Sequence, residues 1–275
     1  MRTQTKISDF IIKIFIWLFT LIAVGALILI VGFVLIKGLP YISWNFIVSP
    51  DTGILPMIVT TLIIIPLTLI IAAPIGICSA IYLVEYARPG KIVNLIRFAT
   101  ESLAGIPSII YGLFGYVFFC LTLGFNYSIL SGSLTLSIMV LPTIIRTTEE
   151  ALKTVPNSYR EGSLALGATK LTTIFKIILP SSISGILTAI ILSIGRIVGE
   201  TAAVIFTLGT VTDMPKNLMS SGRTLATHMY NLAREGTNEN AAFATAAVLI
   251  IVVALINLSA RSVAGQFQKK LHSKK

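Results

Sequence analysis

The sequence predicts an all-α integral membrane protein with six transmembrane helices and both chain ends in the cytoplasm. Of its 275 residues, 55% are hydrophobic and only 12% are charged, and the mean hydropathy is +0.91. Soluble domains carry about 25% charged residues, so this chain has too few charges to cover a water-facing surface. The hydrophobic residues also fall in blocks long enough to cross a bilayer, which takes about 20 largely apolar residues.

Six hydrophobic blocks meet that length, and we expect one transmembrane domain over residues 1–275. The third and fourth blocks are separated only by a short turn at 124–127, which predicts a tight antiparallel pair. The first block is longer than the hydrophobic region of a signal peptide and lacks a small-residue cleavage site. The predicted spans are 11–36, 57–84, 103–124, 129–148, 181–209 and 241–260.

The orientation follows from the uneven distribution of Lys and Arg. Sixteen of these cations lie in the two tails and in the connections after the second and fourth blocks, and four lie in the other connections. Cytoplasmic loops carry the excess of Lys and Arg, so both termini are expected in the cytoplasm. The net charge of +10 then reflects basic loops beside lipid. No basic stripe interleaves with aromatics, so we expect no nucleic-acid partner.

Residues for catalysis or for holding a cofactor are lacking in the sequence. Cys78 and Cys120 lie inside apolar blocks, and His228 and His272 are far apart, so neither a disulfide framework nor a metal site is indicated. The phosphate-cradling pattern G-x-x-x-x-G-K-[ST] is absent, so any ATP chemistry must come from another chain. We expect no cofactor on this chain and no enzymatic activity of its own.

The cytoplasmic connection at 149–180 has its own helical signals. Pro156 suits the first turn of a helix and Gly167 suits the residue just past a helix end, which predicts a short helix over 157–166. A second helical stretch is expected from 170 to the start of the fifth span. The external connection at 210–240 mixes proline, glycine and short apolar stretches, and is predicted to form a partly helical cap.

The predicted helix over 157–166 would carry Tyr159, Ser163 and Leu166 on one side. A short amphipathic helix on the membrane face suits the groove of a partner protein. A connector that docks on its own bundle fits the same pattern, and patterning alone leaves both interpretations open.

The spacing of residues in this connection carries a resemblance. Glu161, Gly167, Ile177, Leu179 and Pro180 fit the pattern E-A-A-x3-G-x9-I-x-L-P, which resembles the cytoplasmic signature of permease subunits of bacterial ATP-binding-cassette (ABC) importers. The resemblance implies a coupling helix that sits in a cleft of a partner ATPase. Small residues replace the two alanines of the pattern. The implied coupling-loop residues are Tyr159, Glu161, Gly162, Ser163, Leu166, Gly167 and Pro180.

The fifth block contains charges at membrane depth. Arg196 lies sixteen residues beyond Pro180, or roughly 24 Å along a helix, where a charge costs at least about 2.5–3.5 kcal/mol. Glu200 can reach the same helix face four residues on, and Thr201 adds a hydroxyl. The pair either locks helices together, or Arg196 recognises a tetrahedral oxyanion while Glu200 orients it and limits how tightly the anion binds. A neighbouring stripe of small residues predicts close helix packing: Gly195, Gly199 and Ala203.

Further segments resemble the A-type permease subunits of phosphate-specific importers. They are residues 53–57, 74–86, 101–112, 195–201 and 222–228. The resemblance implies the type I ABC importer permease fold in the bacterial cytoplasmic (inner) membrane, and alternating access to phosphate along a path at Arg196, Glu200 and Thr201.

The implied partners are a C-type permease in a heterodimer, two ATPase subunits that bind ATP and magnesium, and an external phosphate-binding protein. The alternative to phosphate is that the permease imports another oxyanion such as sulfate or molybdate. An ion-coupled secondary transporter fits less well, because Glu200 is the only acid deep in a predicted span.

Overall fold

The computed structural model describes residues 2–49, 53–236 and 238–272, and the described chain is built of helices. Lys274 and Lys275, part of the predicted basic tail, lie outside the described residues. Short π-helical turns interrupt or extend three of the helices: η2 (Tyr82–Tyr86), η3 (Tyr116–Thr122) and η4 (Ile174–Ile178). The helices are α1 (Arg2–Gly38), α2 (Trp44–Val48), α3 (Leu55–Ile81), α4 (Lys91–Ala104), α5 (Ser108–Gly115), α6 (Ile129–Lys153), α7 (Asn157–Ala165), α8 (Lys170–Thr173), α9 (Leu179–Val198), α10 (Ala202–Thr207), α11 (Leu225–Glu235) and α12 (Glu239–His272).

Five of the predicted spans are confirmed as helices long and apolar enough to cross a membrane. Their mean hydropathy over the most apolar stretch lies between 1.6 and 3.0. The predicted ends of the other four spans agree with the observed ends to within about five residues, but the fifth, predicted at 181–209, is displaced by eleven residues at both ends from the observed span Lys170–Val198. The five spans are Ile12–Tyr41, Leu55–Tyr86, Ile129–Lys153, Lys170–Val198 and Glu239–Ser262.

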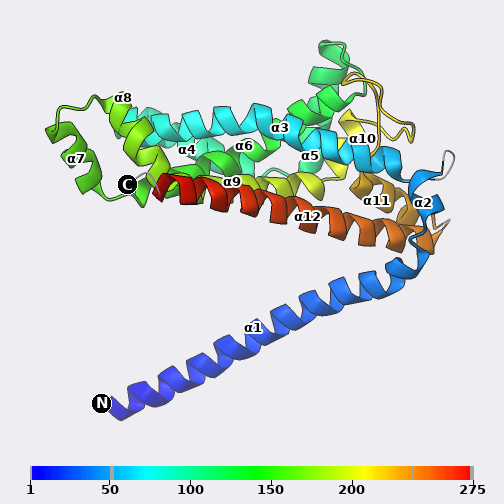
Figure 1. Cartoon of the computed structure of the whole chain (residues 1–275), viewed down its shortest axis with the longest axis horizontal. Helices are drawn as coiled ribbons and strands as arrows, with labels where there is room; N and C mark the ends of the chain where they lie inside the picture. Colours follow the sequence, from blue (N-terminus) through cyan, green and yellow to red (C-terminus); the bar gives the residue numbers. More distant parts are fainter. Residues whose placement is uncertain (1, 50–52, 237, 273–275) are drawn as a thin grey trace.

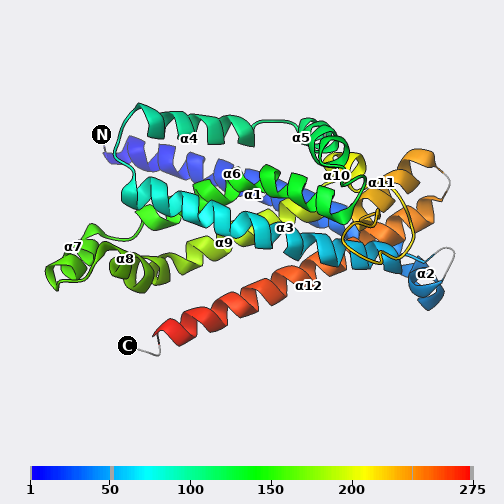
Figure 2. The same ribbon diagram turned by 90° about the horizontal axis from the view of Figure 1, so that it is seen from above.

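The third predicted span is wrong as a straight helix. It is a bent pair in which α4 and the segment from α5 to the end of η3 meet at 100°. In Figure 2, α4 runs alongside the bundle while α5 is seen nearly end-on, so the expected tight antiparallel pair with α6 is not formed. The break follows from Pro107, which has no N–H and disfavours helical backbone in the residue before it. The hydropathy pattern missed α4 because Lys91, Arg97 and Glu101 dilute it.

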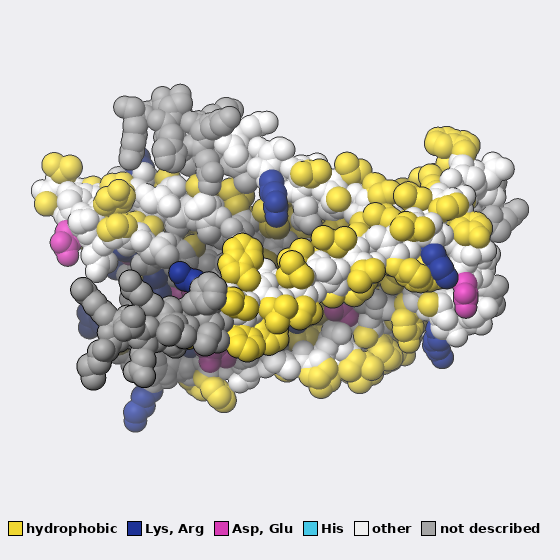
Figure 3. All heavy atoms as spheres, turned by 90° about the horizontal axis from the view of Figure 1, so that it is seen from below, with side chains coloured by type: hydrophobic (Ala, Val, Ile, Leu, Met, Phe, Trp, Pro, Cys, Tyr) yellow, Lys and Arg dark blue, Asp and Glu magenta, His cyan; other side chains and the backbone are white. Residues whose placement is uncertain are grey.

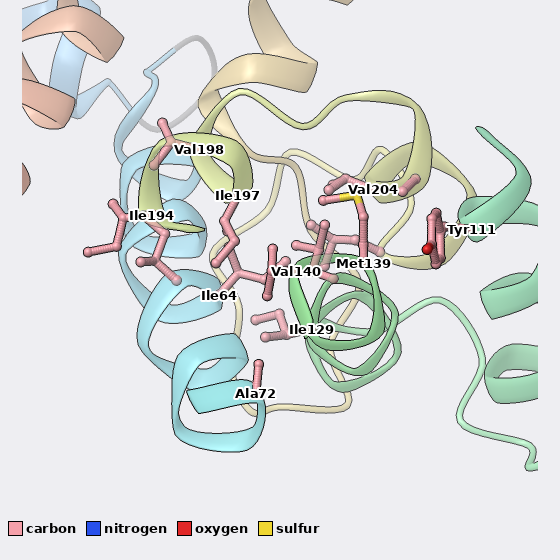
Figure 4. Close-up of a cluster of buried hydrophobic side chains, with 14 of the residues drawn as sticks. Ile64, Ala72, Tyr111, Ile129, Met139, Val140, Ile194, Ile197, Val198 and Val204 are labelled. Carbon is pink, nitrogen blue, oxygen red and sulfur yellow. The ribbon is translucent and has the colours of Figure 1, made fainter. Parts of the chain in front are cut away.

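The core lies where α3, α6, α9 and α10 meet. Figure 4 shows Ile64, Met139, Val140, Ile197 and Val204 pointing toward one another from these helices. One hydrogen bond crosses the same region: the buried Ser137 Oγ on α6 donates to the Thr68 carbonyl on α3 at 3.1 Å. Apolar packing and internal hydrogen bonds together hold the helices in one arrangement.

Helix α1 stands apart from the bundle along most of its length (Figure 1), and the carboxyl end of α1 contacts α12. There the Lys37 ammonium lies 5.1 Å from the Phe33 ring centre and 5.3 Å from that of Phe243. Hydrophobic side chains cover much of the face seen from the α1 side in Figure 3. In a bilayer this surface is covered by lipid or by another membrane helix.

Different helices lie at the two ends of the molecule. Helices α7 and α8 lie at the same end as the start of α1 and the end of α12, and α2, α10 and α11 lie at the opposite end (Figures 1 and 2). This arrangement agrees with a predicted topology that puts both termini and the 149–180 connection on one side. That this side is the cytoplasm stays a prediction from the Lys and Arg counts.

The closest approach of α3 and α6 yields a prediction about stability. A Cβ atom at Gly76 would lie 2.6 Å from Cγ2 of the buried Ile144, so Gly76→Ala should overpack the interface and destabilise the chain by about 1–3 kcal/mol. Gly32→Ala on α1, where nothing lies within 4 Å of the added atom, is the matched control and should not destabilise. Thermal unfolding in detergent measures both, and equal midpoints would contradict the packing described.

Candidate functional site

Arg196 lies in the last turn of α9 and is half-buried. Among the residues that the structure describes, no carboxylate lies within ion-pair distance of its guanidinium. A Cβ atom at the neighbouring Gly195 would meet nothing within 4 Å, so this side of α9 is open in the single chain. Since a guanidinium stays protonated and offers five donors, Arg196 is equipped to bind an anion from that side.

Glu200 lies outside helix α9, in which it was predicted to align with Arg196. Helix α9 ends at Val198, and Glu200 lies in the break before α10. Its Oε1 accepts hydrogen bonds from the backbone N–H groups of Thr201 and Ala203, both at 3.2 Å. The prediction that Arg196 and Glu200 share one helix face is therefore wrong, because the helix that would align them is broken. The first N–H groups of α10 need an acceptor, and Glu200 supplies it beside the half-buried Thr201.

The stripe of small residues is split between two environments. Gly195 and Gly199 have room around them, whereas Ala203 is fully buried. A Cβ atom at Gly112 on α5 would come within 2.8 Å of the Ala203 Cα. Close packing is thus confirmed at Ala203 alone, and the surface near the two glycines is left open within this chain.

The helix predicted in the 149–180 connection is confirmed as α7. Pro156 stands at the residue before its first turn, one place earlier than predicted. Gly167 has φ +82°, a left-handed backbone that suits glycine, and its N–H donates to the Leu164 carbonyl at 3.0 Å. The chain therefore turns sharply after α7 and continues into α8.

The predicted coupling residues divide between the inside and the outside of this connection. Ser163 is buried, and its Oγ lies 2.8 Å from Thr173 Oγ1 on α8. Contrary to the prediction, Ser163 therefore does not share an exposed surface with Tyr159 and Leu166. Tyr159 is 48% exposed and Leu166 is 91% exposed. Glu161 and Gly162 are also exposed, and Pro180 lies half-buried in the first turn of α9.

Arg160 is a residue that the sequence patterns did not single out for a role. Its side chain is only 18% exposed and pairs with Glu85, which is 8% exposed, at 2.8 Å. The partners lie 75 residues apart, so no local spacing could reveal the pair.

A second pairing that the sequence did not indicate joins α4 to α6, where the buried Glu149 carboxylate lies 2.7 Å from both Arg97 and Lys153. That pairing lines a cleft of about 190 Å³.

At the opposite end, Arg223 and His228 hold the α11 segment in place. Arg223 donates to the Thr210 carbonyl at 2.9 Å and lies 3.2 Å from His228 Nδ1. Because a guanidinium can only donate, Nδ1 is the acceptor and Nε2 carries the ring proton. Burial, and then the Arg223 charge, lower the pKa of His228 to about 4. His228 also lines a cleft of about 460 Å³ with Asp213.

The part of the chain that the structure describes contains no cluster of three or more His, Cys, Asp or Glu side chains able to hold a metal ion. Cys78 is exposed and Cys120 is buried, and both are free thiols. The arrangement therefore offers one half-buried cation in the last turn of α9, one exposed helix pair at the end shared with the termini, and a cation at the other end.

Comparison with known proteins agrees with this arrangement. Residues 72–273 match the family described as the binding-protein-dependent transport system inner membrane component. A probable ABC transporter permease protein, YqgI of Bacillus subtilis, is 32% identical over 97% of this chain and 98% of its own length. The phosphate transport system permease protein PstA 1 of Mycobacterium tuberculosis (strain CDC 1551 / Oshkosh) is 38% identical over 76% of this chain and 69% of its own length.

A solved structure shares the fold. A chain of a bacterial alginate ABC transporter, crystallised with its alginate-bound periplasmic protein, superimposes with a TM-score of 0.68 at 16% identity, over 92% of this chain and 96% of its own. Membership of the family implies ATPase and binding-protein partners. The chain therefore belongs to the binding-protein-dependent transport system inner membrane components, as the non-catalytic, multi-pass permease subunit of an ABC importer.

Proposed function

We propose that this permease subunit conducts inorganic phosphate into the cell, using ATP and magnesium bound by partner ATPase subunits and no cofactor of its own. The observation that carries the proposal is Arg196, a cation within span α9 that pairs with no carboxylate of the described chain. Leaving a charge unpaired at that depth is costly, and a passing oxyanion would offset the cost. The 38% identity to a phosphate transport system permease protein supports phosphate among the oxyanions.

The path would run beside the break between α9 and α10. Arg196 offers planar, multiple donors to a tetrahedral anion, and Thr201 adds a hydroxyl near the break. Glu200 serves the path indirectly, because its bonds to the Thr201 and Ala203 N–H groups hold the start of α10. Its negative charge close by also keeps the anion from binding too tightly to leave.

We further propose that α7 and α8 dock on a partner ATPase. The connection leaves large apolar side chains exposed at the end of the molecule that holds the termini, which is the predicted cytoplasmic end. Gly162 has nothing within 4 Å of its missing Cβ, so another protein could approach the backbone closely. The exposed apolar residues here are Tyr159, Leu164, Leu166, Leu171 and Phe175.

The assembly would contain a second permease of the C type as heterodimer partner, with both proteins in the bacterial cytoplasmic (inner) membrane and their termini in the cytoplasm. The apolar surface of α1, which stands away from its own bundle, gives such a partner a place to pack. An external phosphate-binding protein would deliver substrate to the α10–α11 end.

Uptake of labelled phosphate by cells that lack this chain tests the substrate and the path. The native chain should restore uptake, and Arg196→Ala should lower it by about tenfold to a hundredfold, because hydrogen bonds to charged groups contribute about 1.5–3 kcal/mol. Arg146→Ala is the matched control, since the Arg146–Glu150 pair is exposed and such pairs contribute little. Normal uptake by Arg196→Ala, at equal amounts in the membrane, would contradict the path. Restored uptake of sulfate in place of phosphate would contradict the substrate.

Leu166 tests the ATPase contact. Leu166→Asp should leave the chain folded, because the side chain is 91% exposed, but it should sharply reduce recovery of the ATPase subunits with the chain, since a charge would enter an apolar contact. Leu166→Met keeps the apolar surface and serves as the control. Equal recovery of ATPase with Leu166→Asp would show that Leu166 lies outside the contact.

The His228 pKa predicts a pH dependence at the opposite end. A folded pKa of about 4, against the ordinary 6.5, means that the neutral ring stabilises the fold fully above pH 6.5. This stabilisation is lost as the pH falls from 6.5 toward 4, because protonation puts a second cation beside Arg223. Because intrinsic amide exchange slows as the pH falls, the quantity to compare is the protection factor of the α11 amides, which should fall over that interval, and His228→Gln should remove the fall. A measured pKa near 6.5 for the His228 imidazole would contradict its burial beside Arg223.

A further inference from the structure

Arg160 connects three separate elements through one guanidinium. Its Nε and Nη2 donate to Glu85 Oε1 in η2, at 3.0 and 2.8 Å. Its Nη2 also donates to the Leu152 carbonyl near the end of α6 at 3.0 Å, and its Nη1 donates to the Val155 carbonyl at 2.8 Å. Since Arg160 itself belongs to α7, the guanidinium joins α7, the end of α6 and the turn that follows α3.

The Arg160–Glu85 pair is largely buried, unlike the Arg146–Glu150 pair. The Arg160 and Glu85 side chains are 18% and 8% exposed, whereas those of Arg146 and Glu150 are 65% and 63% exposed. A buried pair is weakly screened by solvent and salt, and removal of one partner leaves a buried charge uncompensated. The link between α7 and η2 therefore resists separation more than a surface pair would.

A second contact ties the same two parts of the chain together. The Lys170 ammonium on α8 lies 4.7 Å from the ring centre of Tyr86 in η2. The loop thus contacts η2 from both of its helices, and a small apolar cluster of Ala80, Leu152, Val155 and Ile178 packs beneath these links. Any displacement of α7 and α8 would act directly on η2.

The segment that receives these contacts is a π-helical turn. Residues Tyr82–Tyr86 continue α3 with the wider π winding, which is rare and often marks functional sites in helices. Helix α3 in turn packs on α6 and α9 in the core, and α9 carries Arg196. A continuous packed route therefore leads from the exposed face of α7 to the helix with the intramembrane cation.

We infer that Arg160 is a positioning residue that transmits movement of α7 to α3, so that the loop and η2 move as one body during transport. The inference rests on the proposed docking of α7 and α8 on a partner ATPase and adds the connection that carries the movement into the membrane. Arg160 touches neither the transported anion nor ATP in this account. It acts through Glu85 and the α6 carbonyls.

The test measures phosphate transported per ATP hydrolysed, with the full importer reconstituted in vesicles: this chain, its partner permease, the ATPase subunits and the binding protein. Arg160→Ala should lower this ratio at least fivefold while ATP hydrolysis stays within about twofold of native. Arg160→Lys, which keeps the charge but not the planar fork, should give an intermediate ratio. Arg146→Ala, the matched exposed arginine, should keep the native ratio.

The double variant Arg160→Ala, Glu85→Ala leaves no unpaired buried carboxylate. It therefore tests whether an effect of Arg160→Ala comes only from misfolding caused by the unpaired Glu85. It should show the same low ratio as Arg160→Ala, since both break one link. If either variant yields less importer but the importer that remains keeps the native ratio, the pair serves folding only and the inference is overturned.

The inference and the proposed function fail in distinguishable ways. A native importer that moves no phosphate, or a chain that recovers no ATPase subunit, overturns the proposed function. A native importer that moves phosphate, together with an unchanged ratio in Arg160→Ala, overturns the role of Arg160 alone.

Discussion

The interaction on which the structure most depends is the bond between a charged side chain and free backbone groups at a helix break. A helix leaves its first N–H and last C=O groups without partners inside the helix, and within a bilayer each such unsatisfied group costs several kcal/mol. Arg160 takes the carbonyls of Leu152 and Val155 as α6 ends. Glu200 takes the N–H groups of Thr201 and Ala203 as α10 begins. The positions of the Arg160 and Glu200 side chains are thus set by hydrogen bonds to backbone groups at helix ends.

This constraint distinguishes charges that build the fold from Arg196. Glu200 is engaged by α10 and Glu85 by Arg160, and Glu149 bridges Arg97 and Lys153. Arg196 has no such carboxylate among the described residues. The membrane part of an importer that carries anions needs one cation with spare donors and a route that links it to the ATPase side. In the proposed function, Arg196 and the α7–η2–α3 contacts would supply these two features.

The sequence was sufficient for most of the fold because hydrophobic length decides where a helix can span a membrane. It predicted four spans closely and a fifth with its bounds displaced by eleven residues, and it also predicted α7 from Pro156 and Gly167. It failed at the third span, where Pro107 breaks the path and the charges of α4 lower the hydropathy. It failed also in pairing Arg196 with Glu200, since four-residue spacing implies a shared face only if the helix continues. The local signal of the break is Gly199, the residue that follows the last residue of α9, and it was interpreted as part of a packing stripe.

The links between distant residues could not be predicted from spacing at all. Arg160 and Glu85 are 75 residues apart, and only the way the loop folds back toward η2 brings them together. The same holds for Glu149 and Arg97, which meet because α4 lies along α6. Ser163 shows the reverse case, since its helix was predicted but its burial against Thr173 depends on how α8 folds back.

The measurement that tests the central claim most directly is ATP-driven accumulation of phosphate by the purified importer in vesicles, with competing oxyanions present. The account predicts accumulation that needs this chain, ATP and the binding protein, and that excess sulfate or molybdate leaves unchanged. Accumulation of sulfate or molybdate in preference to phosphate would contradict the proposed substrate. It would leave the chain as the permease of an importer for a different anion.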